Sequence, residues 1–365
     1  MTDLRLGFDA AQGRVAASLS VVSGRIRPEA MTVYALMRNE RFLLPAFLHH
    51  YRSLGAEQFL ILSDRSDDGT TELIRSQPDC VLLASTFAYG DWLDLPAGGP
   101  VRRRRAGVLM KSVIPRVFLE GSVGVYADAD EFLVLPPPMR SLQDVVAALR
   151  AESADAVHAA MVEMYPERFS DLLEAVPPPG SLGELVDVAP FFDAHPLLRP
   201  GGGDARPTVV GESASTRLFR HFAIGERRRV LDPLPLPLRR RFTTTRFSSA
   251  VAKTPVVRFR PGVDHDGSHE VRGGSSCTAL LGLLHFKFTP DSLLKVERII
   301  AEKSHSRNSI KYVGYRELFA EMRRKGGSFM GPTSTRYEGP GSLERCALIH
   351  GPGRTAAADD PGSLG

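Results

Sequence analysis

The stretch Val123-Gly-Val-Tyr-Ala-Asp-Ala-Asp-Glu131 joins a short hydrophobic run directly to three carboxylates. Two earlier units have the same layout: the apolar run at 32–36 leads into Arg38-Asn-Glu40, and the run at 58–62 leads into Asp64-Arg-Ser-Asp-Asp-Gly69. Between and after these runs, apolar residues recur at helical spacing, in the stretches 42–51, 70–77 and 108–119. Such alternation is typical of an α/β fold with a mostly parallel sheet and crossover helices.

Polar residues follow each of these three strands. In open parallel sheets, ligands bind beyond the carboxyl ends of the strands. We therefore expect the segments 38–40, 64–69 and 128–131 to converge on one crevice.

The rest of the chain suggests how the fold is organised. We expect a β-rich N-terminal extension at 1–30 and a main domain at 31–326, followed by a flexible tail at 327–365 that is rich in Gly, Pro, Ser and Ala. Within the main domain, proline and glycine runs interrupt any regular period at about 177–261, which predicts a loop-rich insertion. Order returns with an apolar strand at 280–288 and an amphipathic helix from about 290 to 304.

Composition is that of an ordinary globular protein, and cysteine usage favours a reducing cytoplasm. The 365 residues are 43% hydrophobic and 24% charged, which is enough to bury a large core. Cys80, Cys277 and Cys346 are widely spaced, so neither a disulfide framework nor a zinc site is indicated. The chain's first residues do not resemble a signal peptide, and no later apolar run is long enough to span a membrane. Peripheral attachment to a membrane through a partner stays open.

Arginines cluster at 102–105, 227–229 and 239–241. They are compatible with solvated loops, with a cationic rim around an anionic diphosphate, or with a nucleic-acid surface. No nucleic-acid motif or interleaved aromatic residues accompany them, so we do not expect nucleic acid as a partner.

Asp128 and Asp130 have the spacing of a metal centre. In an extended segment, two acids at i and i+2 point the same way, and a divalent cation is the usual reason for crowding them. Mn²⁺ or Mg²⁺ held here would bridge the two phosphates of a nucleotide donor. A polar turn without chemistry is the alternative, and the hydrophobic runs on both sides favour the metal.

The loop from Asp64 begins like a calcium-binding loop, but Arg75 stands where a bidentate glutamate is required. We expect instead that Asp64 accepts hydrogen bonds from a base or ribose, while Ser66 or Asp68 caps the helix that begins near Thr70. Capping alone remains an alternative.

The segment Asp264-His-Asp-Gly-Ser-His-Glu270 is dense in acid and base side chains. It suits an active-site loop in which His265, Asp266 or His269 orients or deprotonates an acceptor hydroxyl. A plain polar turn and a zinc site are the alternatives. His285 lies inside an apolar run, where the residue pattern alone favours a core histidine.

Four ordered motifs together resemble the family-2-like glycosyltransferases of the GT-A fold. They are the run from Leu36 to Gly55 with its Arg-Asn-Glu opening, the Ser-Asp-Asp-Gly-Thr loop ending at Thr70, the Asp-Ala-Asp-Glu-Phe centre ending at Phe132, and the pair Gly267-Ser-His269 and Leu283-Leu-His-Phe-Lys-Phe288. The resemblance covers roughly residues 31–317, with a weak middle. Arg65 departs from it, since Asn or Asp is frequent there.

The resemblance implies a Rossmann-like GT-A sheet with flanking helices and a role for each matched residue. The residues that would belong to the nucleotide site are Arg38, Asn39, Glu40, Asp64 and Asp68. Asp128 and Asp130 would hold the metal and diphosphate, and His285 would be a further metal or phosphate ligand. Lys287 would contact the diphosphate, and His269 would be the first choice of base. The expected activity is metal-dependent transfer of a sugar from a nucleotide-sugar donor to a glycan or other hydroxyl acceptor, with inversion, as in polysaccharide biosynthesis.

Two rival functions remain. A nucleotidyltransferase shares the fold class, but usually has a glycine-rich phosphate loop after the first strand, where this chain has Arg-Asn-Glu-Arg-Phe. A non-catalytic protein on a transferase fold, which binds nucleic acid or anionic glycan, is the other. A phosphatase of the D-x-D-x-T/V type is excluded because Glu131-Phe132 follows the second aspartate.

Overall fold

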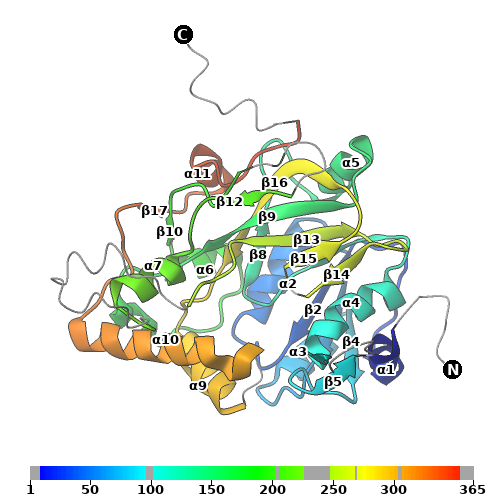
Figure 1. Cartoon of the computed structure of the whole chain (residues 1–365), viewed down its shortest axis with the longest axis horizontal. Coiled ribbons are helices and arrows are strands. Elements are labelled where there is room, and N and C mark those ends of the chain that lie inside the picture. Colours follow the sequence, from blue (N-terminus) through cyan, green and yellow to red (C-terminus); the bar gives the residue numbers. More distant parts are fainter. Residues whose placement is uncertain are drawn as a thin grey trace, which may run out of the picture.

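The computed structural model describes residues 9–95, 102–199, 201, 206–225, 247–267, 269–302 and 306–353. A nine-stranded sheet forms its centre (Figure 1). In spatial order its strands are β1 (Leu19–Ser23), β4 (Cys80–Ser85), β3 (Gln58–Ser63), β2 (Thr32–Met37), β7 (Val123–Tyr126), β13 (Ala252–Arg258), β9 (Ala156–Glu163), β16 (Ser276–His285) and β8 (Glu131–Val134).

The sheet is mixed but mostly parallel. Strands β2, β3, β4, β7, β9 and β16 run in one direction, whereas β1, β13 and β8 run against it. The predicted α/β class with a large, mostly parallel sheet is therefore confirmed. The strands predicted at 32–36, 58–62, 123–127 and 280–288 are all present, with bounds that differ by a few residues.

Further elements surround this sheet. The other strands form two-stranded pairs: β5 (Trp92–Leu95) with β6 (Arg102–Arg105), β10 (Phe191–Asp193) with β17 (Ser334–Arg336), β11 (Leu198–Arg199) with β12 (Thr208–Val209), and β14 (Asp264–Asp266) with β15 (Glu270–Arg272). The helices are α1 (Ala10–Ser18), α2 (Leu44–Ser53), α3 (Thr70–Arg75), α4 (Ala106–Phe118), α5 (Leu142–Ala151), the 3₁₀ helix η2 (Phe169–Leu173), α6 (Leu182–Val188), α7 (Ala214–His221), α9 (Ser292–Glu302), α10 (Ser306–Lys325) and α11 (Pro340–Arg345).

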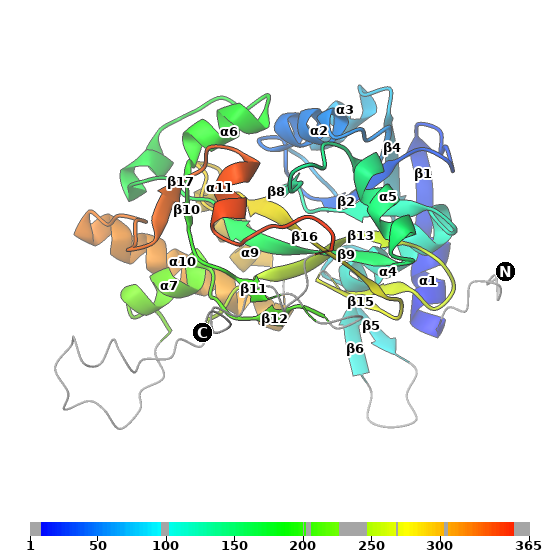
Figure 2. The ribbon, with the colours of Figure 1, turned by 90° about the horizontal axis from the view of Figure 1, so that it is seen from above.

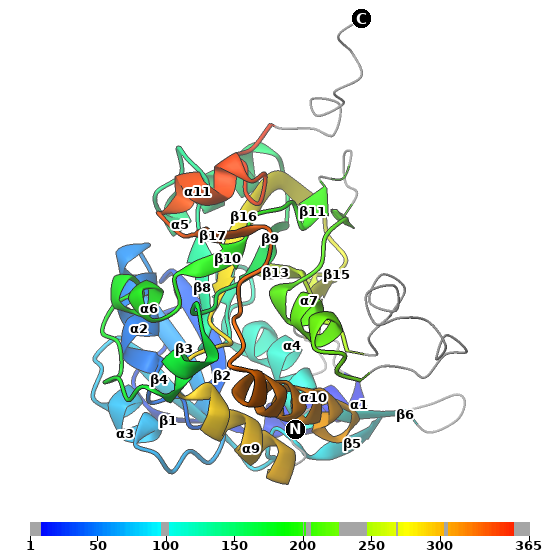
Figure 3. The ribbon, with the colours of Figure 1, turned by 90° about the vertical axis from the view of Figure 1, so that its left-hand side faces the viewer.

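Both faces of the sheet are covered by helices, and this is why its strands are continuous apolar runs. Along β2, Val33, Ala35 and Met37 join the core beneath α2, α5 and α11, whereas Tyr34 and Leu36 join the core beneath α1 and α4. Figure 3 shows α2 and α5 on one side of the sheet and α4 on the other. Every residue of β2 is buried.

A third apolar cluster lies beside the sheet rather than on it. It joins η2, α7, α9 and α10 through aromatic side chains such as Phe219, Tyr315 and Phe329. Figure 2 shows α7 and α10 at one end of the molecule and α1 and α4 at the other. This cluster brings α9 and α10 alongside the carboxyl edge of the sheet, the edge where the parallel strands end.

Three predicted segments differ from the structure. Residues 1–30 are not simply β-rich: the described part contains α1, and β1 pairs with β4 as an edge strand of the main sheet. The loop-rich stretch does not extend to 261, because β13 lies between β7 and β9 inside the sheet. A β-branched run within 252–258 is short enough to be missed beside proline-rich text.

The predicted flexible tail is wrong for residues 327–353. Strand β17 pairs with β10, the backbone of His350 pairs with Leu280, and Leu343, Leu348 and Ile349 are fully buried in the main core. Composition suggested a tail, but a few apolar side chains suffice to dock a Gly-rich segment. Residues 354–365 lie outside the described part of the chain. Among the helices that the structure describes, none has the length and apolar character needed to cross a membrane.

Leu343→Ala tests whether the C-terminal segment is part of the core. Because Leu343 is fully buried, the substitution should lower the free energy of unfolding by about 2 to 5 kcal/mol, as measured by urea denaturation. Leu294→Ala, at a side chain that is 75% exposed, is the matched control and should change it by less than about 0.5 kcal/mol. Equal, small effects at both positions would contradict the docked segment.

Candidate functional site

A cavity of about 620 Å³ opens at the carboxyl edge of the sheet. Parallel strands end at this edge and antiparallel strands begin there, so both kinds of strand contribute side chains to it. Register places Glu131 of β8, His285 of β16 and Glu163 of β9 in one row across three neighbouring strands. Sequence-predicted residues that line the cavity are Arg38, Glu40, Asp64, Asp128, Asp130, His269, His285 and Lys287.

Asp128 is held by two buried lysines. The Lys111 ammonium of α4 lies 3.5 Å from Oδ1, and that of Lys253 in β13 lies 3.3 Å from Oδ2. The Tyr126 hydroxyl also donates to this carboxylate. Lys253 is fully buried and forms a second ion pair with Glu131, whose carboxylate accepts a hydrogen bond from the Asp128 backbone N–H.

The charges of this group stabilise one another. Burial by itself would raise the pKa of Asp128, but Lys111 and Lys253 outweigh burial and hold that pKa well below its usual range. Burial by itself would lower the pKa of Lys111, but the charge of Asp128 outweighs burial, so the pKa of Lys111 is raised. Both groups are therefore charged at neutral pH. A buried cation of this kind is retained only where carboxylates pair with it.

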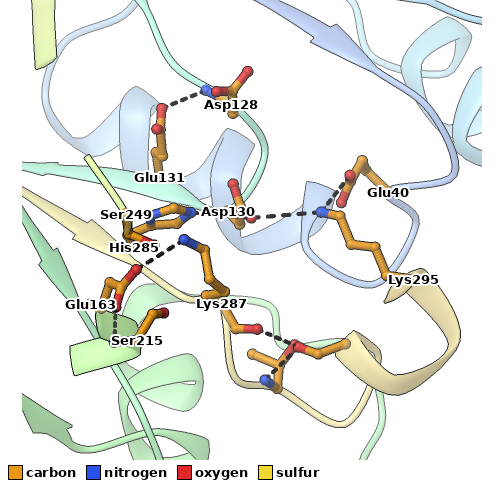
Figure 4. Close-up of polar contacts among 12 residues, drawn as sticks. Glu40, Asp128, Asp130, Glu131, Glu163, Ser215, Ser249, His285, Lys287 and Lys295 are labelled. Carbon is orange, nitrogen blue, oxygen red and sulfur yellow. Dashed lines mark hydrogen bonds and ion pairs between the residues drawn. The ribbon is translucent and has the colours of Figure 1, made fainter. Parts of the chain in front are cut away.

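Asp130 belongs to a second group that includes Glu40, His285 and Lys295 (Figure 4). The Lys295 ammonium lies 2.7 Å from Glu40 Oε1 and 3.6 Å from Asp130 Oδ2, and His285 Nε2 lies 3.5 Å from the same Asp130 oxygen. Burial raises the pKa of Glu40 to about 7, since Lys295 only partly offsets the cost of desolvation. Two carboxylates thus share one lysine.

The donor set at Asp130 suits a hard divalent cation that also binds phosphate. Among the described residues, no three His, Cys, Asp or Glu side chains are gathered as a closed metal cage. Mg²⁺ typically binds one or two carboxylates together with substrate phosphates, rather than a cage made only of protein. Glu40 Oε2 and His285 Nδ1 are buried without a hydrogen-bond partner. Asp130, His285 and Glu40 therefore fit such an ion better than Asp128, which is occupied by lysines.

Glu163 and Lys287 form a third group. The Lys287 ammonium lies 2.9 Å from Glu163 Oε1, and the Ser215 backbone N–H donates to Glu163 Oε2 at 2.6 Å. Figure 4 shows Glu163 between these two donors. Burial would raise the pKa of Glu163, but Lys287 outweighs it and lowers that pKa to about 2.

Asp64 lies at the cavity and is not a helix cap. Its carboxylate accepts a hydrogen bond from the Tyr89 backbone N–H at 3.1 Å and lies 3.9 Å from the Arg38 guanidinium. The N-cap residue of α3 is Gly69, and Asp68 precedes it: Asp68 accepts hydrogen bonds from the Thr70 backbone N–H and hydroxyl and is not among the described residues that line the cavity. Burial raises the pKa of Asp64.

Asn39 has a structural position between two loops. Its backbone has φ of 55°, its side-chain amide donates to Asp67 at 2.6 Å, and its carbonyl oxygen accepts from the Asp67 backbone N–H at 2.9 Å. It therefore ties the loop after β2 to the loop after β3. Neither Asn39 nor Asp68 is among the described residues that line the cavity.

The three candidate bases have different surroundings. His269 lines the cavity, and burial, together with Lys253 and Lys111, lowers its pKa to about 3. His265 packs among the rings of Tyr34, Tyr126 and Phe259 and is a core histidine behind the site.

Asp266 forms ion pairs with Arg104 and Arg272 at 2.8 and 2.9 Å. Among the described residues that line the cavity, neither His265 nor Asp266 is found, so neither is placed to contact a substrate bound there. Two carboxylates of the loop-rich region, Asp193 and Glu212, are paired with Arg217 and Arg220 and are likewise outside the described lining.

One arginine cluster borders the cavity, as the cationic-rim interpretation expects. Arg103, Arg104 and Arg105 of β6 are among its lining residues, and the Arg105 guanidinium lies 4.5 Å from the ring centre of Trp92. The clusters at 227–229 and 239–241 lie outside the described residues.

Several charged residues of the site were not identified from the sequence. They are Lys111, Glu163, Lys253, Lys295 and Lys311. For two of them a signal was present: Lys111 interrupts an apolar helix, and Glu163 ends an apolar strand. A charge at such a position predicts a buried partner, but not which one.

Comparison of the chain with models of known protein families finds no match, and comparison with curated proteins finds none either.

The triad Asp128, Lys253 and Glu131 should contribute strongly to stability. Lys253→Met removes the cation and leaves Glu131 buried without it, which should lower the free energy of unfolding by about 3 to 5 kcal/mol in chemical denaturation. The double variant Lys253→Met/Glu131→Gln removes both charges and should recover part of this loss. If the single variant is as stable as the wild type, the ion pair does not hold this part of the site.

Proposed function

We propose that the chain is a metal-dependent glycosyltransferase that moves a sugar from a nucleotide-diphosphate sugar to a glycan or other hydroxyl acceptor, with inversion, on a GT-A type fold. The observation that carries this proposal is one cavity lined by Arg38 and Asp64, by Asp130 and His285, and by Lys287. These groups come from four separate parts of the chain. Their chemistry suits, in turn, a nucleoside, a metal and a diphosphate.

The charge layout supports a diphosphate ligand. The group at Asp130 has two carboxylates for one lysine, whereas Lys287 lies close by and donates a hydrogen bond to Glu163. A Mn²⁺ or Mg²⁺ ion at Asp130 and His285 would neutralise the charge that develops on the departing diphosphate. Lys287 would donate to a phosphate oxygen, and Asp64 would accept a hydrogen bond from the base or ribose.

His269 is the proposed acceptor for the proton of the attacking hydroxyl. It is neutral at pH 7, since its pKa is lowered to about 3 by burial first and then by the nearby Lys253 and Lys111. Negative charge brought next to these lysines would raise that pKa and strengthen the base. The inverting stereochemistry, the cytoplasmic location and a role in polysaccharide biosynthesis belong to the same proposal; the three cysteines are unpaired, as a reducing compartment requires.

A nucleotidyltransferase is the second candidate, because metal, nucleotide and diphosphate chemistry would be shared. The two differ in the bond broken: a glycosyltransferase releases a nucleoside diphosphate, whereas a nucleotidyltransferase releases pyrophosphate. A binding protein without turnover would release neither.

Asp130→Asn tests the metal centre. The substitution preserves shape but removes the charge, so release of nucleoside diphosphate from a panel of nucleotide sugars with manganese should fall about a thousandfold or more. The rise in Tm that manganese causes in the wild type should also be absent in this variant, because a ligand that binds only the folded state raises Tm. Asp79→Asn, at a surface carboxylate paired with Arg52, is the matched control. Full turnover by Asp130→Asn in EDTA would exclude a metal role.

His269→Ala tests the base separately from the donor site. We expect transfer to the acceptor to fall by about a hundred- to ten-thousandfold, while manganese and donor affinity stay near the wild-type values by calorimetry. A parallel loss of donor affinity would make His269 a phosphate or metal ligand. If the variant transfers sugar at the wild-type rate, His269 is not the base, and Asp291, a carboxylate that lines the cavity, is the next candidate.

A further inference from the structure

Lys311 of α10 lies beside Lys287 at the cavity. Both side chains line it, and both ammonium groups contact the ring of Tyr315, at 5.7 Å for Lys287 and 5.9 Å for Lys311 from nitrogen to ring centre. Tyr315 is itself fixed by a hydrogen bond to Ser215 at 2.9 Å and lies 3.2 Å from the Ser249 hydroxyl. The two lysines therefore face one wall built from a rigid aromatic side chain.

The two lysines do not have equal partners. Lys287 is paired with Glu163, and the second oxygen of Glu163 is already bonded to the Ser215 backbone N–H. Lys311 donates one hydrogen bond, at 2.6 Å, to the Ser249 hydroxyl. Within the described part of the chain, no carboxylate lies at ion-pair distance from Lys311. Since an ammonium carries three N–H groups, Lys311 keeps donors for a ligand in the cavity.

Keeping Lys311 positively charged beside Lys287 is energetically unfavourable. Burial, and then the charge of Lys287, lowers the pKa of Lys311 to about 7, while Glu163 opposes this shift only in part. Among the described residues, the ionisable neighbours that face Lys311 besides Lys287 are the Glu163 carboxylate and the Tyr315 hydroxyl. An anion bound between the two lysines would remove the repulsion and supply the missing counter-charge.

We propose that Lys311, positioned by its hydrogen bond to the Ser249 hydroxyl, and Lys287 form an anion-binding subsite of the cavity that takes a phosphate or carboxylate group of the bound substrate. In the context of the proposed function, on which this assignment of a substrate rests, the anion is either a phosphate of the nucleotide donor or the carboxylate of an acidic sugar. The subsite itself is a property of the cavity and needs no turnover.

Calorimetric titration with inorganic pyrophosphate and, separately, with glucuronate tests the subsite. Lys311→Gln should weaken binding of the favoured anion by about ten- to hundredfold, the range for a lost hydrogen bond to a charged group. Lys311→Arg should remain within about threefold of wild type, because a cation is preserved. Lys325→Gln changes a lysine at the end of the same helix, paired with Glu321 and outside the described lining, and should have no effect.

The outcomes separate the two sources of the anion. A loss confined to pyrophosphate assigns the subsite to phosphate, and a loss confined to glucuronate assigns it to a sugar carboxylate. Equal binding by Lys311→Gln and wild type, or no binding of either probe by the wild type, overturns the proposal. Both titrations are equilibrium measurements, so they stand even if no sugar transfer is found.

The pH dependence of anion binding by the wild-type protein tests the subsite even if Lys311→Gln does not fold. Between pH 6 and pH 8, affinity for the bound anion should fall about tenfold more in the wild type than in Lys311→Arg, because Lys311 is protonated below its pKa of about 7 and neutral above it; any change in the charge of the probe is common to both proteins. In Lys311→Arg the guanidinium stays charged throughout, so the same titration should show a flatter profile with the same probe. Identical profiles for the two proteins would also reject Lys311 as the anion partner.

Discussion

Pairing of buried lysines with carboxylates at the carboxyl edge of the sheet is the constraint on which the site depends. Lys253 is fully buried and lies between Asp128 and Glu131, and Lys111 approaches Asp128 from the helix that covers one face of the sheet. A buried charge without its partner costs several kcal/mol. The loops that bear these acids are therefore held in place by electrostatics as well as by the apolar layers.

The apolar layers bring the partners to one place. Lys111 comes from a helix whose other buried residues, such as Met110 and Val113, pack on the sheet. Lys253 belongs to an antiparallel strand between β7 and β9, so it enters the edge where parallel strands end. The antiparallel strand β13 thus places a lysine at the same edge of the sheet where the neighbouring strands β7 and β9 lead to carboxylates.

Charge is distributed unevenly within the cavity, and this bears on what it binds. Asp128 and Glu131 are matched by Lys111 and Lys253, whereas Glu40 and Asp130 share Lys295. Lys287 and Lys311 together face Glu163. One part of the cavity is thus short of positive charge and the neighbouring part has a surplus, which is the arrangement expected for a cation and an anion bound side by side. This unevenness supports a metal-diphosphate ligand more directly than any single residue does.

The sequence by itself determined the local elements: the buried strands, the polar loops that follow them, and the acids at 128–131. Apolar period and turn chemistry are properties of neighbouring residues, so they can be read without the fold. Only the tertiary structure decided that Lys253 pairs with Glu131, 122 residues away, that His265 is a core residue, and that Leu343 completes the main core. Strand order and register settle such contacts, and a shift of one residue would turn each side chain to the opposite face of the sheet.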